Sequence, residues 1–396
     1  MTDELVHDVG ERVRFHRLAA RKTQPVVAGL AGITGDYLYQ IERGKKVPTL
    51  KVLVALAAAL GVPPSVLIDE GSGSAARPAR GFAGVDLHRA MSLPVPDIEE
   101  SMPLADLRTQ IDGAWRLWQC SPRRYSQVPS VLGDLVVEAE RALRVSDAAG
   151  EAVQRAVADL YGLVRTVAKR TGRVDLAVLA ADRSCKAAEA SGDQLRAGTA
   201  QWNTAHAAMA GDHVDVAEEI AMTAAERMRV QSGPDAAAVH GSLLLLAAVA
   251  AARRRDPWVA RDRIRAVAPV AYKTGERNTL WTAFGPTNVA MHAVSVEIET
   301  GEIGQAAQLA DEVEHERSPS IERRVAFLLE QAHSYQQLRD HAGSLILLQS
   351  AGREAPEDVA HRPLAHELMR SVVQRAPRTT AREAVRLAKR LGVPVG

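Results

Sequence analysis

Amide, acidic and basic side chains that can contact nucleic acid are concentrated in a short stretch near the N-terminal end. Between residues 12 and 51 there are nine Lys and Arg residues against only Asp36 and Glu42. An excess of about seven positive charges is the electrostatic pattern of a phosphate-binding surface. Amide side chains can pair bidentately with adenine, and carboxylates can accept a hydrogen bond from cytosine. The stretch therefore favours contact with DNA.

Short helices with capping residues and terminal glycines are predicted to position these side chains. Thr23 is expected to cap one helix that ends at Gly32, and Thr34 to cap a second that ends at Gly44. Thr49 is expected to cap a third helix after a basic loop. The apolar positions that should face the core from this third helix are Leu50, Leu53, Leu56, Ala57 and Leu60.

Two short helices joined by a tight glycine-containing turn are typical of a helix-turn-helix. Residues 13–67 resemble the XRE/Cro-type, lambda-repressor-like DNA-binding domain. The matching landmarks are Thr23-Gln24, Ala28, Ala31-Gly32-Ile33-Thr34, Tyr37-Leu38, Ile41-Glu42-Arg43-Gly44, Pro48-Thr49-Leu50, Leu53, Leu56-Ala57 and Leu60-Gly61-Val62. Pro25 departs from the usual acidic residue, but proline is tolerated in a first helical turn.

The resemblance implies that the second helix of the motif faces the major groove and that flanking residues touch phosphates. A further helix is predicted before Thr23. Its arginines, Arg14 and Arg17 among them, are expected to point outward. The alternative is that the basic face is only solvated and that Tyr37 or Tyr39 covers the small core. The predicted DNA-binding residues are Gln24, Thr34, Gly35, Asp36, Tyr37, Tyr39, Gln40, Arg43, Lys45 and Lys46.

The rest of the chain carries a repeated helical pattern. Helix-start signals recur at Asp147, Asp193, Asp235, Asn278 and Ser320, and the last four are spaced 42 or 43 residues apart. Turn signals lie between them, so each unit is predicted to be a helical hairpin, and stacked hairpins form an α-solenoid. The units resemble tetratricopeptide (TPR) repeats in architecture, although they are longer than the usual unit of about 34 residues.

Composition and the positions of glycine, serine and proline residues define the predicted domain organisation of the chain. The 396 residues are 46% hydrophobic, 4% aromatic and 24% charged, with a formal net charge of +1, which favours an all-α globular protein. The predicted domains are a helix-turn-helix bundle at 1–70, a Gly-, Ser- and Pro-rich linker at 71–96 in which little should pack, and a TPR-like domain at 97–396. No apolar run is long enough to span a bilayer, so we expect a cytoplasmic protein.

Polar residues at equivalent repeat positions suggest a ligand groove. Asn203 and Asn288 each lie ten residues after a start signal, and Gln331 lies near the same point of another unit. An amide can both donate to and accept from a peptide backbone, and His206 and Trp281 lie nearby in sequence. The arrangement resembles TPR-like peptide-sensing regulators (the RRNPP group), which implies a peptide effector. A small molecule is one alternative, and simple packing or a protein-partner surface is another.

These observations predict a transcriptional regulator that binds a palindromic operator in double-stranded DNA as a homodimer. The competing interpretations are an adaptor whose helical array docks a partner protein, and an antitoxin or phage-type repressor. No enzyme, cofactor or metal site is expected. His361 and His366 are five residues apart rather than the four of a zinc-binding helix, and no phosphate-binding glycine loop is present.

Overall fold

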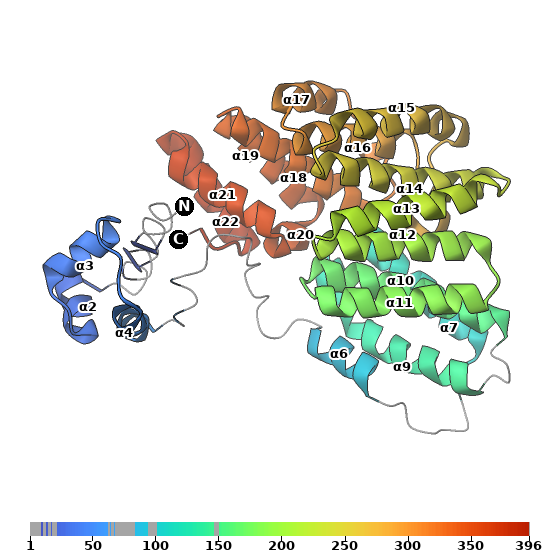
Figure 1. The fold of residues 1–396 in the computed structure, drawn as a ribbon, viewed down its shortest axis with the longest axis horizontal. Helices are drawn as coiled ribbons and strands as arrows, with labels where there is room; N and C mark the ends of the chain where they lie inside the picture. Colours follow the sequence, from blue (N-terminus) through green and yellow to red (C-terminus); the bar gives the residue numbers. More distant parts are fainter. Residues whose placement is uncertain are drawn as a thin grey trace. The chain divides into compact units, whose positions relative to one another are not determined.

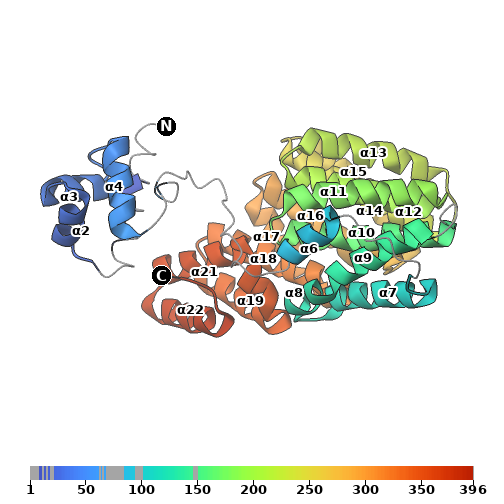
Figure 2. The same ribbon diagram turned by 90° about the horizontal axis from the view of Figure 1, so that it is seen from below.

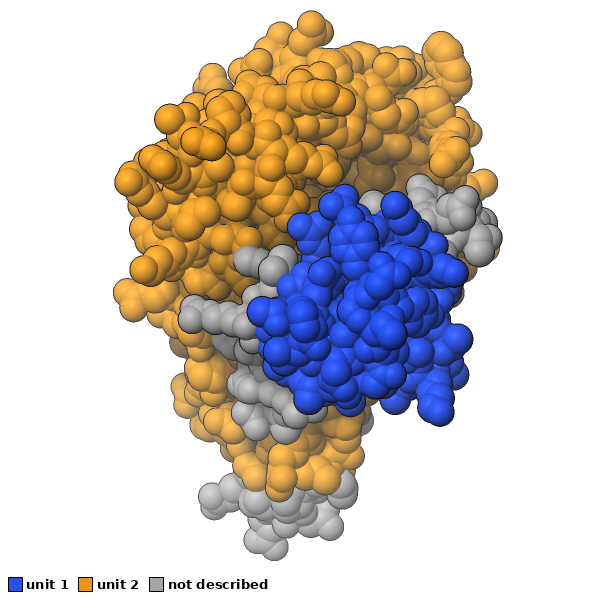
Figure 3. Space-filling view, turned by 90° about the vertical axis from the view of Figure 1, so that its left-hand side faces the viewer, with its two compact units in different colours: residues 1–77, 396 blue, residues 78–395 orange. Residues whose placement is uncertain are grey.

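The computed structural model of the chain describes residues 9–10, 13–14, 17, 22–61, 64, 67, 84–93, 101–145 and 150–395. The predicted helix start at Asp147 lies outside these residues. The chain divides into two compact units, residues 1–77 with 396, and residues 78–395 (Figure 3). The described residues of both units are helical and contain no strand, which confirms the predicted all-α fold.

The first unit contains the predicted short helices α2 (Gln24–Ala31), α3 (Gly35–Glu42) and α4 (Leu50–Leu60). Thr34 caps α3 by accepting a hydrogen bond from the backbone of Tyr37 at 3.2 Å, and Thr49 caps α4. Gly32 has φ 65°, so it makes the turn between α2 and α3 in a left-handed conformation that suits glycine. The buried residues that these helices contribute include Val27, Ala28, Leu38, Ile41, Leu53, Leu56 and Ala57.

Two local expectations for this unit are wrong. Thr23 occupies the N-cap position of α2, but its side chain makes no capping hydrogen bond. Leu50 is 72% exposed, because the core contributed by α4 begins one turn later, at Leu53.

The second unit is an array of helical hairpins stacked in chain order (Figure 1). It opens with α6 (Gly84–Ser92), α7 (Leu104–Cys120), the short α8 (Arg124–Gln127) and α9 (Pro129–Val145). The hairpins that follow are α10 (Glu151–Arg170) with α11 (Val174–Ala190), α12 (Gln194–Ala210) with α13 (Val214–Arg229), α14 (Pro234–Arg253) with α15 (Pro257–Thr274), α16 (Pro286–Glu299) with α17 (Ile303–Asp311), and α18 (Ile321–Gln337) with α19 (His341–Glu354). Helices α20 (Pro356–His361), α21 (Pro363–Arg375) and α22 (Arg378–Leu391) close the array and contact α19. Figure 2 shows α21 and α22 next to α19.

The predicted helix starts are partly confirmed. Asp193 and Ser320 cap α12 and α18 through their side chains. Asp235 lies in the first turn of α14, after Gly233 as N-cap. Asn278 does not start a long helix: it precedes a 3-10 turn, η1 (Thr279–Trp281), and α16 begins at Pro286. Tertiary contacts of this loop, described below, override the local signal.

Helix α6 lies within the predicted linker 71–96, where little packing was expected. Leu87 and Met91 of this helix are 4% and 3% exposed and belong to the core of the first hairpins. They are four residues apart, so they share one helix face. Arg183 of α11 also donates to the backbone oxygen of Met91 at 2.9 Å. The part of this segment that the structure describes is therefore attached to the array.

Helix α14 is the most apolar of the described long helices. By length and composition it could cross a membrane, but 72% of its apolar window is buried inside the array. Its buried residues contribute to several core clusters, Leu243 and Leu246 to one and Leu245 to another. Its apolar character is therefore accounted for by its place in the core.

The two ends of the array contact each other. Trp118 on α7 donates its indole N–H to Glu322 on α18 at 2.8 Å. On α8, the fully buried Arg124 forms an ion pair with the fully buried Asp358 on α20. Arg362 donates to the same carboxylate at 2.6 Å. Residues more than 200 positions apart thus join, and the array closes on itself.

Replacing Asp358 with Ala is expected to destabilise the protein by about 3–5 kcal/mol, because it leaves the buried Arg124 without its carboxylate. Urea unfolding followed by circular dichroism measures the change. Asp182→Ala is the matched control: its pair with Lys186 is half-exposed and is expected to contribute less than about 1 kcal/mol. An equal response of the two variants would contradict a structural role for the buried pair.

Candidate functional site

Helix α3 presents the predicted base-contacting residues on its outer face. Asp36 and Tyr39 are exposed, while Tyr37 and Gln40 are half-buried. The Gln40 amide donates to Asp36 at 2.8 Å, one helical turn away. The Tyr37 hydroxyl donates to the backbone of Val47 at 3.3 Å. Asp36 therefore orients Gln40, and Tyr37 fastens the basic loop that follows α3.

A buried ion pair fixes α3 within the first unit. Glu42, at the end of α3, accepts from Arg17 Nε at 2.6 Å and from its second guanidinium nitrogen at 2.9 Å. The Gln24 amide donates to the same carboxylate at 2.7 Å. The hydrogen bond to Glu42 raises the pKa of Arg17. Arg17 is 9% exposed, so the expectation that it faces outward is wrong: the buried Glu42 carboxylate draws it inward.

The phosphate-contact candidates flank this scaffold. Arg43, Lys45 and Lys46 are exposed directly after α3, and the Arg43 guanidinium lies 5.6 Å from the Tyr39 ring centre. Arg43 also lines a surface hollow of about 540 Å³. The residues that line it are Arg14, Arg17, Lys22, Thr23, Gln24, Pro25, Tyr39, Glu42 and Arg43. The first unit therefore presents a basic, hydrogen-bonding face next to α3.

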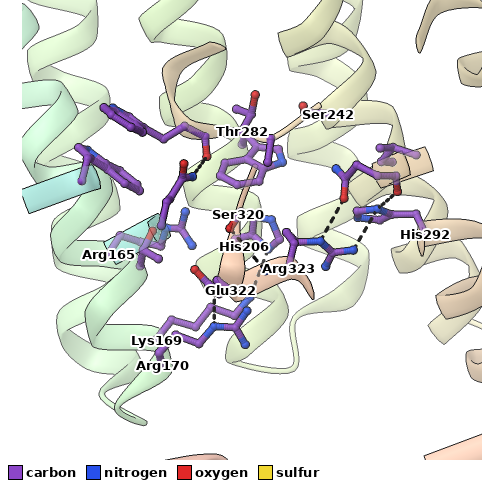
Figure 4. A pocket seen from close by; sticks show the side chains of 18 residues that line it. Arg165, Lys169, Arg170, His206, Ser242, Thr282, His292, Ser320, Glu322 and Arg323 are labelled. Atoms are coloured by element: carbon purple, nitrogen blue, oxygen red, sulfur yellow. Dashed lines mark hydrogen bonds and ion pairs between the residues drawn. The ribbon is translucent and has the colours of Figure 1, made fainter. Parts of the chain in front are cut away.

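The second unit contains an inner cavity of about 80 Å³ lined by its first helices of successive hairpins (Figure 4). A larger hollow of about 420 Å³ has several lining residues in common with it. Of the predicted effector residues, His206, Trp281 and Asn288 line the inner cavity. Gln331 does not: it donates to Asp311 at 3.4 Å and lines a separate hollow.

The two repeat asparagines hold arginines rather than standing free. The side-chain oxygen of Asn203 accepts from Arg165, and that of Asn288 accepts from Arg323 Nε at 3.0 Å. Both asparagines are buried, at 4% and 3% exposure. Their carbonyl groups therefore orient guanidinium groups at the cavity, a role that spacing along the sequence does not reveal.

Basic residues of the inner helices dominate the electrostatics of the cavity. Burial and the charges of Arg170 and Arg165 hold the pKa of Lys169 well below its usual range. Burial, with the charge of Lys169, likewise depresses the pKa of His206. Lys169 Nζ lies 3.2 Å from His206 Nδ1, so the neutral ring can accept a hydrogen bond from the amine. Burial and Arg323 lower the pKa of His292 to about 3.

Glu322 is the one carboxylate among the residues that line the inner cavity. Burial opposes its ionisation, but the guanidinium groups of Arg170, Arg124 and Arg362 outweigh burial and hold its pKa below the usual range. Glu322 forms an ion pair with Arg170. None of these lysine, arginine and glutamate residues is among the effector residues predicted from the sequence. Their signal was a basic residue inside an apolar helix face, as at Arg165 between Val164 and Val167.

A loop between α15 and α16 covers one side of the cavity. Its residues Leu280, Trp281 and Ala283 have φ of 45°, 67° and 54°, which is unfavourable for non-glycine residues. Gln119 of α7 holds the loop by donating to the Trp281 backbone at 2.9 Å and accepting from Asn278 at 2.5 Å. The Trp281 ring stacks on Trp115 with centres 5.4 Å apart and planes 5° apart.

Comparison with known proteins identifies the first unit. Residues 8–69 match the family model of a helix-turn-helix domain, whereas no curated protein is found to match the chain. The predicted helix-turn-helix is therefore confirmed, and the chain carries a helix-turn-helix domain in addition to its helical array.

Three solved structures are similar at low identity. The apo competence regulator ComR from Streptococcus vestibularis is 12% identical, with coverage of 98% of this chain and 100% of that chain and a TM-score of 0.29. PlcR from Bacillus thuringiensis, in complex with the peptide PapR7 and DNA, is 13% identical, with 67% and 94% covered and a TM-score of 0.28. ComR from S. thermophilus, in complex with DNA and its signalling peptide ComS, is 14% identical, with 87% and 99% covered and a TM-score of 0.29.

Replacing Gln119 with Ala is expected to release the loop over the cavity, because both of its side-chain hydrogen bonds are lost. The expected cost is about 1–3 kcal/mol of unfolding free energy, with a change in tryptophan emission as the stacked Trp115 and Trp281 separate. Urea unfolding and fluorescence measure the two effects. Gln337→Ala, which removes an amide from the exposed end of α18, is the control. Unchanged emission in the Gln119 variant would show that the loop is held by other contacts.

Proposed function

We propose that this regulator binds a palindromic operator as a homodimer, with α3 of each copy in the major groove. The helix-turn-helix match over residues 8–69 carries the proposal. One such helix reads only a few base pairs, so two copies on half-sites about one helical turn apart are the usual solution. The outer face of α3 and the exposed Lys45 and Lys46 support this arrangement.

Base reading is assigned to Gln40, with Asp36, Gly35 and Tyr39 beside it. The bond between Gln40 and Asp36 uses an amide N–H and leaves the amide oxygen free to accept from an adenine amino group. Thr34 and Tyr37 act by fixing α3 and the following loop. They share the DNA face without being assigned a base.

Phosphate contacts are assigned to Arg43, Lys45 and Lys46, which are exposed after α3. Gln24 keeps its proposed phosphate contact, in a position set by its hydrogen bond to Glu42. Contacts of this kind fix the register of the protein on DNA and carry no base information.

The array is proposed to sense an effector, a peptide or a small molecule, in its inner cavity. His206, Trp281 and Asn288 line this cavity, and Asn203 positions Arg165 within it. Effector binding would change how the array closes and so the spacing of the two DNA-binding units in the dimer. We propose that the protein acts in the cytoplasm, without enzymatic activity.

Substitutions of Gln40 and Lys45 are expected to affect DNA binding differently. Operator sites are first selected from genomic fragments with the full-length protein. Gln40→Ala should reduce discrimination between the operator and a site with one altered base by about 1–3 kcal/mol. Lys45→Ala should weaken binding to all DNA about equally and reduce the salt slope by about 1. Fluorescence anisotropy at several salt concentrations measures both.

Lys186→Ala is the matched control, because Lys186 is an exposed lysine of the array, with its side chain 74% accessible. It is expected to leave DNA affinity and its salt dependence unchanged. Binding that does not respond to salt, with no preference for any selected fragment over random DNA, would refute operator recognition. Identical behaviour of the Gln40 and Lys45 variants would refute the division between base and phosphate contacts.

A further inference from the structure

Four basic side chains meet at the inner cavity of the array. We call Arg165, Lys169 and Arg170 of α10 and Arg323 of α18 the cation cluster; all four line the cavity (Figure 4). Arg170 pairs with Glu322. The other three have no ion-pair partner within the described part of the chain. The cluster is therefore poorly compensated.

The partners of these three side chains are neutral. Arg165 donates to Asn203, Lys169 lies against His206, and Arg323 donates to Asn288 and lies 3.3 Å from His292 Nδ1. Neutral amides and imidazoles orient a cation without cancelling its charge. Desolvated charges are costly unless they are paired. Glu322 acts on all three side chains through space, and Glu330 acts on Arg323, but neither carboxylate forms an ion pair with them within the described residues, so an added negative charge is favoured here.

Among the residues that the structure describes, Arg165 is the clearest example of a buried cation that lacks an anionic partner. It is 3% exposed, and its Nε has no hydrogen-bond partner within the described residues. Its guanidinium lies 5.3 Å from the centre of the Trp202 ring, which fixes its plane. A planar guanidinium held in this way is arranged for a carboxylate or phosphate group.

The cavity has room for such a group. Its volume of about 80 Å³ is several times the ~10–15 Å³ that one buried water occupies by the same measure. Lys169, Arg170, His206, His292 and Arg323 also line the adjoining hollow of about 420 Å³. An anionic group can therefore occupy the inner cavity while the rest of a larger molecule extends into the hollow.

We propose that the cation cluster is the binding site for a carboxylate or phosphate group of an anionic effector. The inference rests on the proposed sensing function and adds the chemical class of the ligand. Arg165 and Arg323 supply oriented guanidinium donors, and Glu322 holds Arg170 in place. Lys169 supplies an amine that the bound anion would hold in its ammonium form. Binding of the anion would add negative charge next to Arg165, Lys169 and Arg323.

Tryptophan emission can locate the binding event, because all five tryptophans lie in the array and none in residues 1–77. The test uses the full-length Trp258→Phe protein, which lacks the tryptophan that is 74% exposed. Pyrophosphate and citrate are titrated at constant ionic strength, with chloride as the reference. Saturable changes in emission and melting temperature are expected. Tighter binding of pyrophosphate would indicate that the site is made for a phosphate group, and tighter binding of citrate that it is made for a carboxylate group.

Lys169→Gln and Arg165→Gln, each made separately, are expected to weaken probe binding at least tenfold, whereas Lys186→Gln leaves it unchanged. Without a probe, Lys169→Gln should raise the melting temperature, because the depressed pKa of Lys169 means that placing this amine beside Arg165 and Arg170 costs folding free energy at neutral pH. A purely structural lysine would lower it. The proposal is overturned if neither probe saturates, or if the Lys169 and Arg165 variants bind like the Lys186 control.

The experiments distinguish failure of operator binding from failure of the anion site. Loss of DNA recognition with saturable, cluster-dependent anion binding would refute operator binding and leave the anion site standing. Operator binding without any cluster-dependent response to pyrophosphate or citrate would refute the anion site and leave DNA recognition intact.

Discussion

The interior of the array depends on the interactions that Glu322 makes with distant helices. Its carboxylate accepts from Trp118 of α7 and pairs with Arg170 of α10, while the backbone oxygen of Glu322 accepts from Arg362 at 3.2 Å. One residue of α18 thus connects the opening helix α7, the first hairpin and the segment that begins α21. Because each hairpin of an open repeat array contacts only its neighbours, such a link between distant helices is what encloses the cavity.

The same closure explains how the protein tolerates so many basic residues inside. Asparagines and neutral histidines hold Arg165 and Arg323 without cancelling their charge. The stacked Trp115 and Trp281 and the strained loop around Ala283 cover one side. Strain of this kind persists only where surrounding contacts enforce it, and Gln119 provides them. Packing of the whole unit thus offsets the unfavourable free energy of the buried basic residues and of the strained loop.

Local signals in the sequence predict most helices and the complete helix-turn-helix. Thr34, Thr49, Asp193 and Ser320 cap helices as expected, because capping depends on a few adjacent residues. The helix start predicted at Asn278 is wrong. Gln119, which is far away in sequence, hydrogen-bonds to Asn278 and Trp281 and holds this segment as a loop. The outward orientation predicted for Arg17 is wrong and the cation cluster was not predicted for the same reason: the orientation of these side chains is set by partners on other helices. Sequence spacing found the repeat positions of Asn203 and Asn288, but it could not reveal that both hold arginines.

The contact between Trp118 and Glu322 has a consequence for synthesis of the chain. The two residues are 204 positions apart, so at about 5–20 residues per second the ribosome needs on the order of 10–40 s to complete the pair. During that time α7 and α8 have emerged, but Trp118 and Arg124 lack the partners that later bury them. The early hairpins must therefore remain soluble with an unfinished interface, a period in which a chaperone or a neighbouring nascent chain can compete for it.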